Sequence, residues 1–272
     1  MKLKLITLLQ KFLSISEKIS PYLFLLVVNL VYLTINKRVS IRLEKKTNSY
    51  YAYDKDLQKK HFFLIASRAT GFIRGLERRF LGMAKNYMID DLDYNDGDIV
   101  VDVGANIGDI KGFTDLLKKE IHYYGFEPSA NEFNILKKNC GDGKAVNKGC
   151  WYEEGVLKFF VSSESCDSSF EEPSSQIESI EEVKVIRLDE FFNENIKLVK
   201  MDGEGCELEI LQGCENIFSK IEYISVDAGY ERGKENLCTF TEVSNYLYSN
   251  GFILQNFQAK SRVVGLFRNH NL

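Results

Sequence analysis

The chain has 272 residues, of which 44% are hydrophobic and 27% are charged. These fractions are close to those of soluble globular proteins, and they exclude a disordered or low-complexity chain. The formal net charge of −4 arises from 35 Lys and Arg residues against 39 Asp and Glu residues, so the chain as a whole has no positive excess for binding nucleic acid. The six cysteines and three histidines show no zinc-ligand spacing, which argues against a zinc site of the usual kind.

The N-terminal part of the chain is basic and contains one strongly apolar run. Residues 22–35 read YLFLLVVNLVYLTI, and Lys2, Lys4 and Lys11 precede them. The run is shorter than the roughly 20 residues that span a bilayer, and no small-residue cleavage site follows it. Three interpretations stay open: a helix buried against the domain, an interfacial helix with cationic flanks, and a short anchor. We therefore expect a cytoplasmic protein, with residues 1–38 in contact with the inner face of a membrane in the last two cases.

Residues 39–97 read as a small α+β region. Alternating apolar and polar residues at 39–46 and an aromatic-rich segment at 49–53 predict the two strands of a hairpin. Apolar residues at helical spacing predict helices over residues 55–65 and 73–85. We interpret this region as a cap over a crevice in the domain that follows, which gives three parts: residues 1–38, 39–97 and 98–272.

From residue 99 onward, the pattern alternates between short β-branched strands and helices. A polar loop is expected at 164–182, a hairpin between 150–152 and 155–162, and a closing antiparallel pair at 252–257 and 262–268. This alternation predicts an α/β fold with a doubly wound, mostly parallel sheet, closing antiparallel strands and the N-terminal α+β extension. The other expected strands are 99–103, 122–126, 144–150, 182–188, 198–201 and 223–226, and the expected helices are 113–120, 129–139, 207–212 and 241–249.

The first chemical motif is the glycine loop after the strand at 99–103. Residues 100–108 read VVDVGANIG, with Asp102, Gly104 and Gly108 in the pattern D-x-G-x-x-x-G. An acidic side chain at the mouth of the strand disfavours a pyrophosphate and favours a cationic group such as an α-ammonium. Glu127 stands 25 residues after Asp102, at the end of the next strand, where a carboxylate can accept hydrogen bonds from a ribose diol. Together these features describe S-adenosylmethionine better than NAD or ATP.

The second set of chemical residues consists of acids at strand ends. Asp202 and Asp227 each end a predicted buried strand, so we expect them side by side at the carboxyl edge of the sheet. With Glu231 nearby, such acids suit a general base, a metal ligand or a hydrogen bond to substrate. Arg232 would clamp an anionic or polyhydroxyl substrate, with a surface ion pair as the alternative.

On these motifs, the sequence resembles the FkbM-type S-adenosylmethionine-dependent methyltransferases, which have a Rossmann-like class I fold. The matching stretches are VVDVGANIGDI, YGFEPSANEFNILKKN, NKGCW and VKMDGEGCELEILQG, and the likeness extends over about residues 98–257. Gly203 and Cys206 depart from the family pattern without removing a functional group. The resemblance implies methyl transfer, usually to a hydroxyl oxygen, on sugars, on glycolipid, lipopolysaccharide or polysaccharide precursors, or on small natural products.

The resemblance also implies roles for individual residues. Related metal-dependent O-methyltransferases place acids at the corresponding strand ends, so Asp202 and Asp227 would hold Mg²⁺ if the reaction uses a metal. From the strand ends themselves, we hypothesise that Asp202, Asp227 or Glu231 acts as the base, directly or through that metal, and that Arg232 contacts the acceptor. An O-methyltransferase of glycan precursors, one of small secondary metabolites, and a non-catalytic S-adenosylmethionine-binding protein all remain as hypotheses. The implied cofactor contacts are Asp102, Gly104, Ala105, Asn106 and Gly108 at the methionine end, Glu127 with Pro128 at the ribose, and Cys150 near the adenine.

Overall fold

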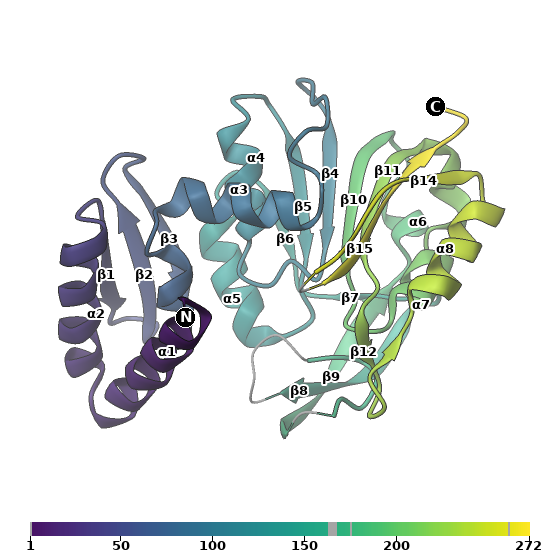
Figure 1. Cartoon of the computed structure of the whole chain (residues 1–272). Helices are drawn as coiled ribbons and strands as arrows, with labels where there is room; N and C mark the ends of the chain where they lie inside the picture. The colour runs from purple at the N-terminus through teal and green to yellow at the C-terminus, as the bar shows by residue number, and fades with distance from the viewer. Residues whose placement is uncertain (1, 163–167, 175, 261) are drawn as a thin grey trace. The chain divides into compact units, whose positions relative to one another are not determined.

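Helix α3 (Leu76–Asn86) contains the boundary between two units of the chain, residues 1–82 and 83–272 (Figure 1). The computed structural model describes residues 2–162, 168–174, 176–260 and 262–272, with side chains from residue 11 onward. The sequence-based division at residues 38 and 97 stays a prediction. Each unit is described separately below.

The first unit combines a helical pair with a three-stranded antiparallel sheet. The predicted hairpin at 39–53 is confirmed, but the helix predicted over 55–65 is wrong, because a third strand occupies residues 59–63. In that strand His61 and Phe63 are buried while Lys60 is exposed, which is the two-residue period of a strand. The elements are α1 (Lys2–Ile19), α2 (Pro21–Ile35), β1 (Val39–Glu44), β2 (Ser49–Asp54), β3 (Lys59–Phe63) and the 3₁₀ helix η1 (Ala66–Phe72).

Helix α2 buries one face against this sheet and pairs with it through its single asparagine. Phe24 is fully buried, and its ring lies 4.7 Å from that of Tyr50. Asn29 donates a hydrogen bond from Nδ2 to the carbonyl of Ile41 and accepts one at Oδ1 from the Ile41 amide, as a neighbouring strand would. Asn29, the asparagine inside the apolar run, thus satisfies the backbone N–H and C=O groups of Ile41 in β1. In the part of the chain that the structure describes, no helix combines the length and hydropathy needed to cross a membrane.

The second unit is built on a seven-stranded sheet in the order β14-β15-β11-β10-β4-β5-β6. All neighbours pair in parallel except β15, which is antiparallel to both β11 and β14. The doubly wound, mostly parallel α/β sheet with closing antiparallel strands is therefore confirmed. Its strands are β4 (Ile99–Val103), β5 (His122–Phe126), β6 (Lys144–Val146), β10 (Ile196–Asp202), β11 (Ile221–Asp227), β14 (Phe252–Ala259) and β15 (Val263–Asn269).

Helices cover both faces of this sheet. In Figure 1, α4 and α5 lie on one side of it, and α6, α7 and α8 lie on the other. Buried side chains of β10 and β11, among them Met201 and Ile224, pack with Leu211 of α7 and Leu247 of α8 in the main core. The helices are α4 (Asp109–Leu116), α5 (Ala130–Asn139), α6 (Leu188–Phe191), α7 (Glu207–Gln212), α8 (Phe240–Ser249) and the 3₁₀ helix η2 (Glu215–Lys220).

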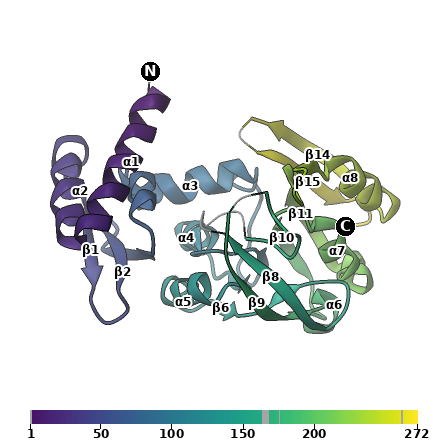
Figure 2. The ribbon, with the colours of Figure 1, turned by 90° about the horizontal axis from the view of Figure 1, so that it is seen from below.

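Three local predictions in this unit are wrong. Helix α4 begins at Asp109 instead of residue 113, because the chain turns directly into the helix at the N-cap Gly108, whose φ of +85° suits glycine. The single strand predicted at 144–150 is two strands in different sheets, β6 and β7 (Gly149–Cys150). Strand β8 (Gly155–Ser162) pairs with β9 (Ile177–Ile186), not with residues 150–152. The small sheet β7-β9-β8 lies below the main sheet in Figure 1 and faces the viewer in Figure 2. The loop predicted at 164–182 ends earlier than expected, because residues 177–182 belong to β9, and residues 164–167 and 175 lie outside the described residues.

Gly104 lets the end of β10 approach the loop after β4. A Cβ atom at Gly104 would lie 2.1 Å from the carbonyl oxygen of Asp202, and the residue has a φ of +68°. Since backbone cannot move aside as a flexible side chain can, only glycine fits at this point. The glycine loop and the acidic end of β10 are therefore held in direct contact by the backbone.

We predict that Gly104→Ala destabilises the protein by about 2 kcal/mol more than Gly141→Ala, because overpacking adds to the penalty of a positive φ. Gly141 is a matched control: its φ is +59°, but nothing lies within 4 Å of a Cβ added there. Urea unfolding of both variants measures the difference. Equal losses of stability would show that the contact with Asp202 is unimportant.

Candidate active site

Four strand ends bring the predicted site residues to one edge of the main sheet. Asp202 and Asp227 are paired in the parallel register of β10 and β11, and Asp102 lies opposite Lys200 in the register of β4 and β10. Glu127 directly follows β5, the neighbour of β4 on its other side. Because parallel strands all end at the same edge, these acids converge as the sequence predicts.

Asp102 is fully buried and already has two partners within the protein. Its Oδ1 lies 2.9 Å from Nζ of Lys200, and its Oδ2 accepts a 2.7 Å hydrogen bond from the hydroxyl of Tyr123. Lys200 also donates hydrogen bonds to the carbonyls of Val103 and Gly104, at 3.2 and 2.9 Å. The carboxylate therefore fixes the start of the glycine loop, and its direct contact with a ligand ammonium stays a prediction.

Glu127 joins the glycine loop to the end of β5. Its Oε2 accepts a 2.8 Å hydrogen bond from the amide of Asn106, and its Oε1 accepts a 2.9 Å hydrogen bond from the amide of Ser129. The side-chain amide of Asn147 donates to the carbonyls of Glu127 and Pro128. Burial raises the pKa of Glu127 to about 8. A carboxyl group held this rigidly at the loop suits the binding of a polar ligand group.

The remaining predicted cofactor residues lie in two different surroundings. Ala105 is buried, and its amide donates to the carbonyl of Phe126, so it anchors the loop to β5. Gly108 ends the loop at the start of α4. Cys150 instead packs in the main hydrophobic core with residues such as Ile186, so its role near an adenine stays a prediction.

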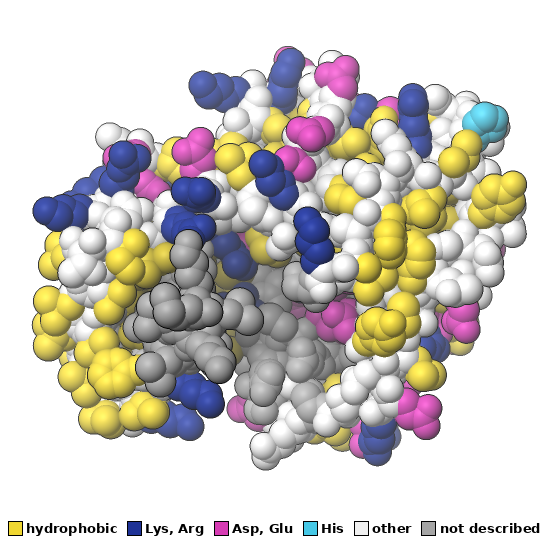
Figure 3. Space-filling view, viewed as in Figure 1, with side chains coloured by type: hydrophobic (Ala, Val, Ile, Leu, Met, Phe, Trp, Pro, Cys, Tyr) yellow, Lys and Arg dark blue, Asp and Glu magenta, His cyan; other side chains and the backbone are white. Residues whose placement is uncertain are grey.

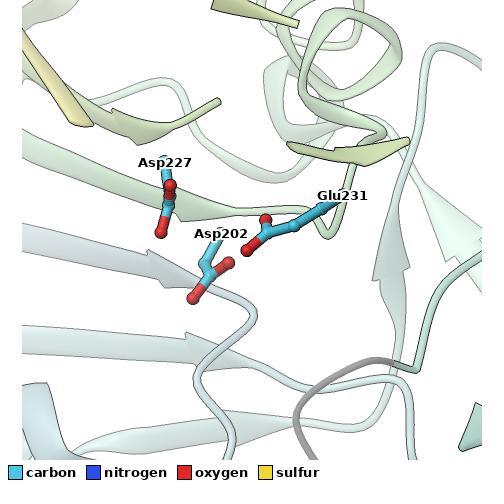
Figure 4. A group of neighbouring side chains, drawn as sticks. All are labelled: Asp202, Asp227 and Glu231. Carbon is cyan, nitrogen blue, oxygen red and sulfur yellow. The ribbon is translucent and has the colours of Figure 1, made fainter. Parts of the chain in front are cut away.

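Three carboxylates form a cluster at this edge. Asp202 ends β10, Asp227 ends β11, and Glu231 belongs to β12 (Tyr230–Arg232), which pairs with β13 (Leu237–Cys238). One oxygen from each lies within 4.8 Å of the others, and Figure 4 shows the side chains converging. Among the residues that the structure describes, Asp202 Oδ1, Asp227 Oδ1 and Glu231 Oε2 are buried without a hydrogen-bond partner. The cluster thus has three acceptor atoms available for a bound group.

Arg262, which the sequence analysis missed, supplies a positive charge to this cluster. Its Nη1 lies 2.9 Å from Oδ2 of Asp202, is hydrogen-bonded to Oδ2 of Asp227, and lies 3.1 Å from the hydroxyl of Tyr87. Tyr87 donates a further 2.5 Å hydrogen bond to Asp202. Two buried acids on adjacent strand ends require a cation nearby. The sequence shows the two acids that need a cation, but no pattern in it identifies Arg262 as that cation.

The three acids differ in how readily they ionise. Burial alone would raise the pKa of Asp202, but Arg262 and Lys200 hold it below its ordinary value. Burial, followed by the charge of Asp202, raises the pKa of Asp227 to about 6. Burial, and then the charges of Asp202 and Asp227, raise the pKa of Glu231 to about 8. The cluster therefore keeps one carboxylate ionised and has another that exchanges a proton near neutral pH.

Arg232 is committed to an ion pair outside the cluster. Its guanidinium makes two hydrogen bonds to Glu209 of α7, at 2.6 and 3.0 Å, and one to the carbonyl of Gly205. Glu207 is buried and accepts hydrogen bonds from the amide of Gly205 and the hydroxyl of Thr239. Both residues hold the loop between β10 and α7 in place. The substrate contact predicted for Arg232 stays a prediction.

The cluster fits a bridging metal ion poorly, although its three oxygen ligands are the kind that Mg²⁺ prefers. The Oδ2 atoms of Asp202 and Asp227 both accept hydrogen bonds from the guanidinium of Arg262. A divalent ion held between these two residues would lie against that fixed positive charge. The predicted magnesium therefore receives no support from this arrangement, and we assign no chemical step to a metal.

The raised pKa of Glu231 predicts how stability depends on pH. Its pKa is about 8 in the folded protein, against an ordinary value of 4.5, so the folded state binds the proton more tightly than the unfolded state. Stability should fall as pH rises from about 4.5 to 8, with a slope from this group of at most about 1.4 kcal/mol per pH unit. Glu231→Gln removes this contribution, so the variant should gain stability relative to wild type across that interval.

Glu235→Gln is the matched control, because Glu235 is an exposed glutamate in the turn that connects β12 to β13. Urea unfolding at a series of pH values measures all three proteins. If the stability difference between Glu231→Gln and wild type is independent of pH, the buried acid does not titrate as described.

Comparisons with known proteins agree with this geometry. A model described as the methyltransferase FkbM domain matches residues 102–254, more than half of the chain. Hexuronic acid methyltransferase AglP from Haloferax volcanii is 27% identical over 146 residues, which cover 48% of this chain and 55% of that protein. The chain thus spans about half the length of this curated relative.

Solved structures with a similar fold include three methyltransferases. Methyltransferase FkbM from Methylobacillus flagellatus KT is 14% identical with a TM-score of 0.47, covering 87% of this chain and 57% of that one. TrmK from M. capricolum, in complex with S-adenosyl-homocysteine, is 12% identical with a TM-score of 0.41, covering 70% of this chain and 67% of that one. An S-adenosylmethionine-dependent methyltransferase from Aquifex aeolicus is 13% identical with a TM-score of 0.43, covering 70% and 88%.

Proposed function

Because this chain belongs to the FkbM methyltransferase family, we propose that it transfers a methyl group from S-adenosylmethionine to a hydroxyl oxygen on a sugar of a glycan, lipopolysaccharide or glycolipid precursor. The observation that carries this proposal is the acidic cluster of Asp202, Asp227 and Glu231 at the same sheet edge as the glycine loop. The sugar acceptor is supported by the relative from Haloferax volcanii, whose name assigns it a hexuronic acid.

The residues around the glycine loop fit S-adenosylmethionine. Gly104 and Gly108 both have positive φ, so the loop turns tightly and its backbone is open to close approach. Glu127 is positioned by two backbone amides and retains lone pairs for the hydroxyls of a ribose. An acid-rich edge also favours a cationic sulfonium over a phosphate-bearing cofactor.

Bound S-adenosylmethionine would supply a methyl group attached to a positively charged sulfur. The leaving group of the transfer is S-adenosylhomocysteine. The protein has to align an acceptor hydroxyl with that methyl group and remove the hydroxyl proton. Glu231 is our preferred base, because its unpartnered Oε2 faces the cluster and its pKa of about 8 lies near neutral pH. The new bond joins oxygen to carbon, the sulfur–carbon bond breaks, and the proton passes to the carboxylate.

Arg262 acts as a positioning residue in this scheme. It holds Asp202 and Asp227 together through one guanidinium nitrogen, with Tyr87 as a further partner. With their Oδ2 atoms fixed, the Oδ1 atoms of both acids remain available for hydroxyl groups of the acceptor. Two adjacent carboxylates that accept hydrogen bonds from neighbouring hydroxyls suit a sugar.

We predict that Glu127→Ala weakens S-adenosylmethionine binding about 10- to 100-fold, because leaving a hydrogen-bonding group without its partner costs about 1–3 kcal/mol. Calorimetry with the full chain measures the dissociation constant. Glu127→Gln keeps an acceptor for the Asn106 amide, so the glycine loop should stay in place in this variant. Any loss of affinity in Glu127→Gln therefore reports on the ribose contact and not on a disordered loop. Glu153→Ala, at an exposed position, is the control. Unchanged affinity in both Glu127 variants would contradict the assigned ribose contact.

We predict that Asp202→Asn, Asp227→Asn and Glu231→Gln each reduce turnover at saturating cofactor by about 100-fold or more, as expected for loss of a general base or its supporting charges. Methyl transfer to a glycan rich in hexuronic acid is followed by mass spectrometry, and calorimetry checks that cofactor affinity is retained. Turnover should be the same with a chelator and with added Mg²⁺. A wild-type rate in Glu231→Gln would refute Glu231 as the base, and wild-type rates in all three variants would refute a catalytic role of the cluster. Cofactor binding without turnover on any glycan would favour a non-catalytic role.

A further inference from the structure

Helix α2 exposes an apolar face on the side opposite its buried one. Phe24, Val28 and Tyr32 are buried at four-residue spacing. The outer stripe consists of residues on the other face that are each between 36% and 61% exposed: Tyr22, Leu23, Leu26, Leu30 and Leu33. In Figure 3 hydrophobic side chains gather over α2, at the left of the view, with Lys and Arg side chains above and below them. Soluble surfaces rarely leave so many large apolar side chains together unless the face is an interaction site.

The same kind of surface continues onto α1 across the turn at Ser20. Phe12, Ile15 and Ile19 are between 53% and 70% exposed. Exposed Lys11 and Lys18 are the residues directly before Phe12 and Ile19 in the sequence. The apolar surface therefore belongs to both helices of the pair, and it is bordered by positive charge.

The first unit as a whole is strongly basic. Residues 1–82 contain 16 Lys and Arg residues and five Asp and Glu residues, a formal charge of +11, whereas the remaining residues carry −15. The end of α2 also borders a cavity of about 560 Å³, whose lining includes Ile35, Arg38, Arg74 and Arg78. Arg38 forms an exposed ion pair with Asp56 there, while Arg74 and Arg78 are exposed. Apolar and cationic groups thus meet at this end of the helix.

These charges decide which partner fits the apolar face. A second copy of this chain that docked through the same face would bring another +11 unit against the first, and like charges repel. An anionic lipid surface supplies both an apolar interior for the outer stripe and negative headgroups for the lysines and arginines around it. Helices of this kind lie in the headgroup region with their apolar side in the acyl boundary.

We propose that the exposed apolar faces of α1 and α2 dock on an anionic membrane surface, with the surrounding Lys and Arg side chains contacting lipid headgroups. This inference goes beyond the proposed reaction, because it concerns a surface of the first unit and does not depend on the acidic cluster. Docking would bring the enzyme to acceptors that are attached to lipids.

Flotation of the full chain with vesicles tests the proposal. Wild type should bind vesicles of phosphatidylcholine mixed with phosphatidylglycerol about tenfold or more tightly than vesicles of phosphatidylcholine alone, and added salt should weaken that binding. The combined variant Leu26→Ser, Leu30→Ser and Leu33→Ser should lose about tenfold or more in affinity, because it removes the apolar contact. Lys37 is exposed just after the end of α2. The combined variant Lys11→Glu, Lys18→Glu and Lys37→Glu should selectively lose the preference for the anionic vesicles.

The matched control replaces three exposed apolar residues of β14, Ile253, Leu254 and Phe257, by serine. This control should bind vesicles as wild type does, and circular dichroism should show every variant folded. The proposal is overturned if wild type does not bind the anionic vesicles, or if the α2 variant binds them unchanged. It is also overturned if the α2 substitutions convert a dimer to a monomer, measured by light scattering, without affecting flotation. Calorimetry with S-adenosylmethionine should be unaffected throughout, so a failure here is distinct from a failure of the proposed reaction.

Discussion

The buried ammonium group of Lys200 is the interaction on which both halves of the candidate site depend. It lies 2.9 Å from Asp102, donates to two carbonyls at the start of the glycine loop, and sits 4.8 Å from the ring centre of Tyr87. Its charge also helps to keep Asp202 ionised. A lysine that is 3% exposed is tolerated only where its charge and its three donors are used, as they are here. One residue of β10 therefore fixes the cofactor loop and tunes the acidic cluster.

The balance of buried charge explains why a proton remains at the site. Lys200 and Arg262 supply two positive charges, whereas Asp102, Asp202, Asp227 and Glu231 could supply four negative ones. Ionising every acid would leave an uncompensated excess of negative charge in a low-dielectric region. Burial, followed by this excess of negative charge, raises the pKa of Asp227 and of Glu231, and the two acids give the site an acid–base pair near neutral pH.

The sequence predicted the sheet and its acidic edge because both arise from local patterns. Short β-branched runs such as 99–103 locate the buried strands, and parallel pairing then places Asp202 beside Asp227. The incorrect predictions concern strands whose pairing partners are distant in the sequence, so that only the tertiary structure determines them. Nothing local distinguishes a helix from an edge strand at 55–65, and nothing at residue 147 shows that the strand there divides between two sheets.

The same distinction applies to the side chains of the site. Asp102 and Glu127 are recognisable from their motifs, but their partners Lys200, Tyr123 and Asn106 follow from strand register and loop conformation. Arg232 illustrates the converse. Its position beside the cluster suggested contact with substrate, whereas the fold pairs it with Glu209, 23 residues earlier in the chain.

The reversed direction of β15 has a consequence for where the methyltransferase unit ends. Because β15 runs opposite to β11, the chain enters it at the edge where the parallel strands finish, with Val264 beside Asp227. Arg262 reaches the acidic cluster only for this reason, and it lies after residue 254, where the family match stops. Tyr87 lies before residue 102, where that match starts. A fragment trimmed to residues 102–254 would therefore keep the acids and lose both the guanidinium and the phenol that offset the repulsion between them.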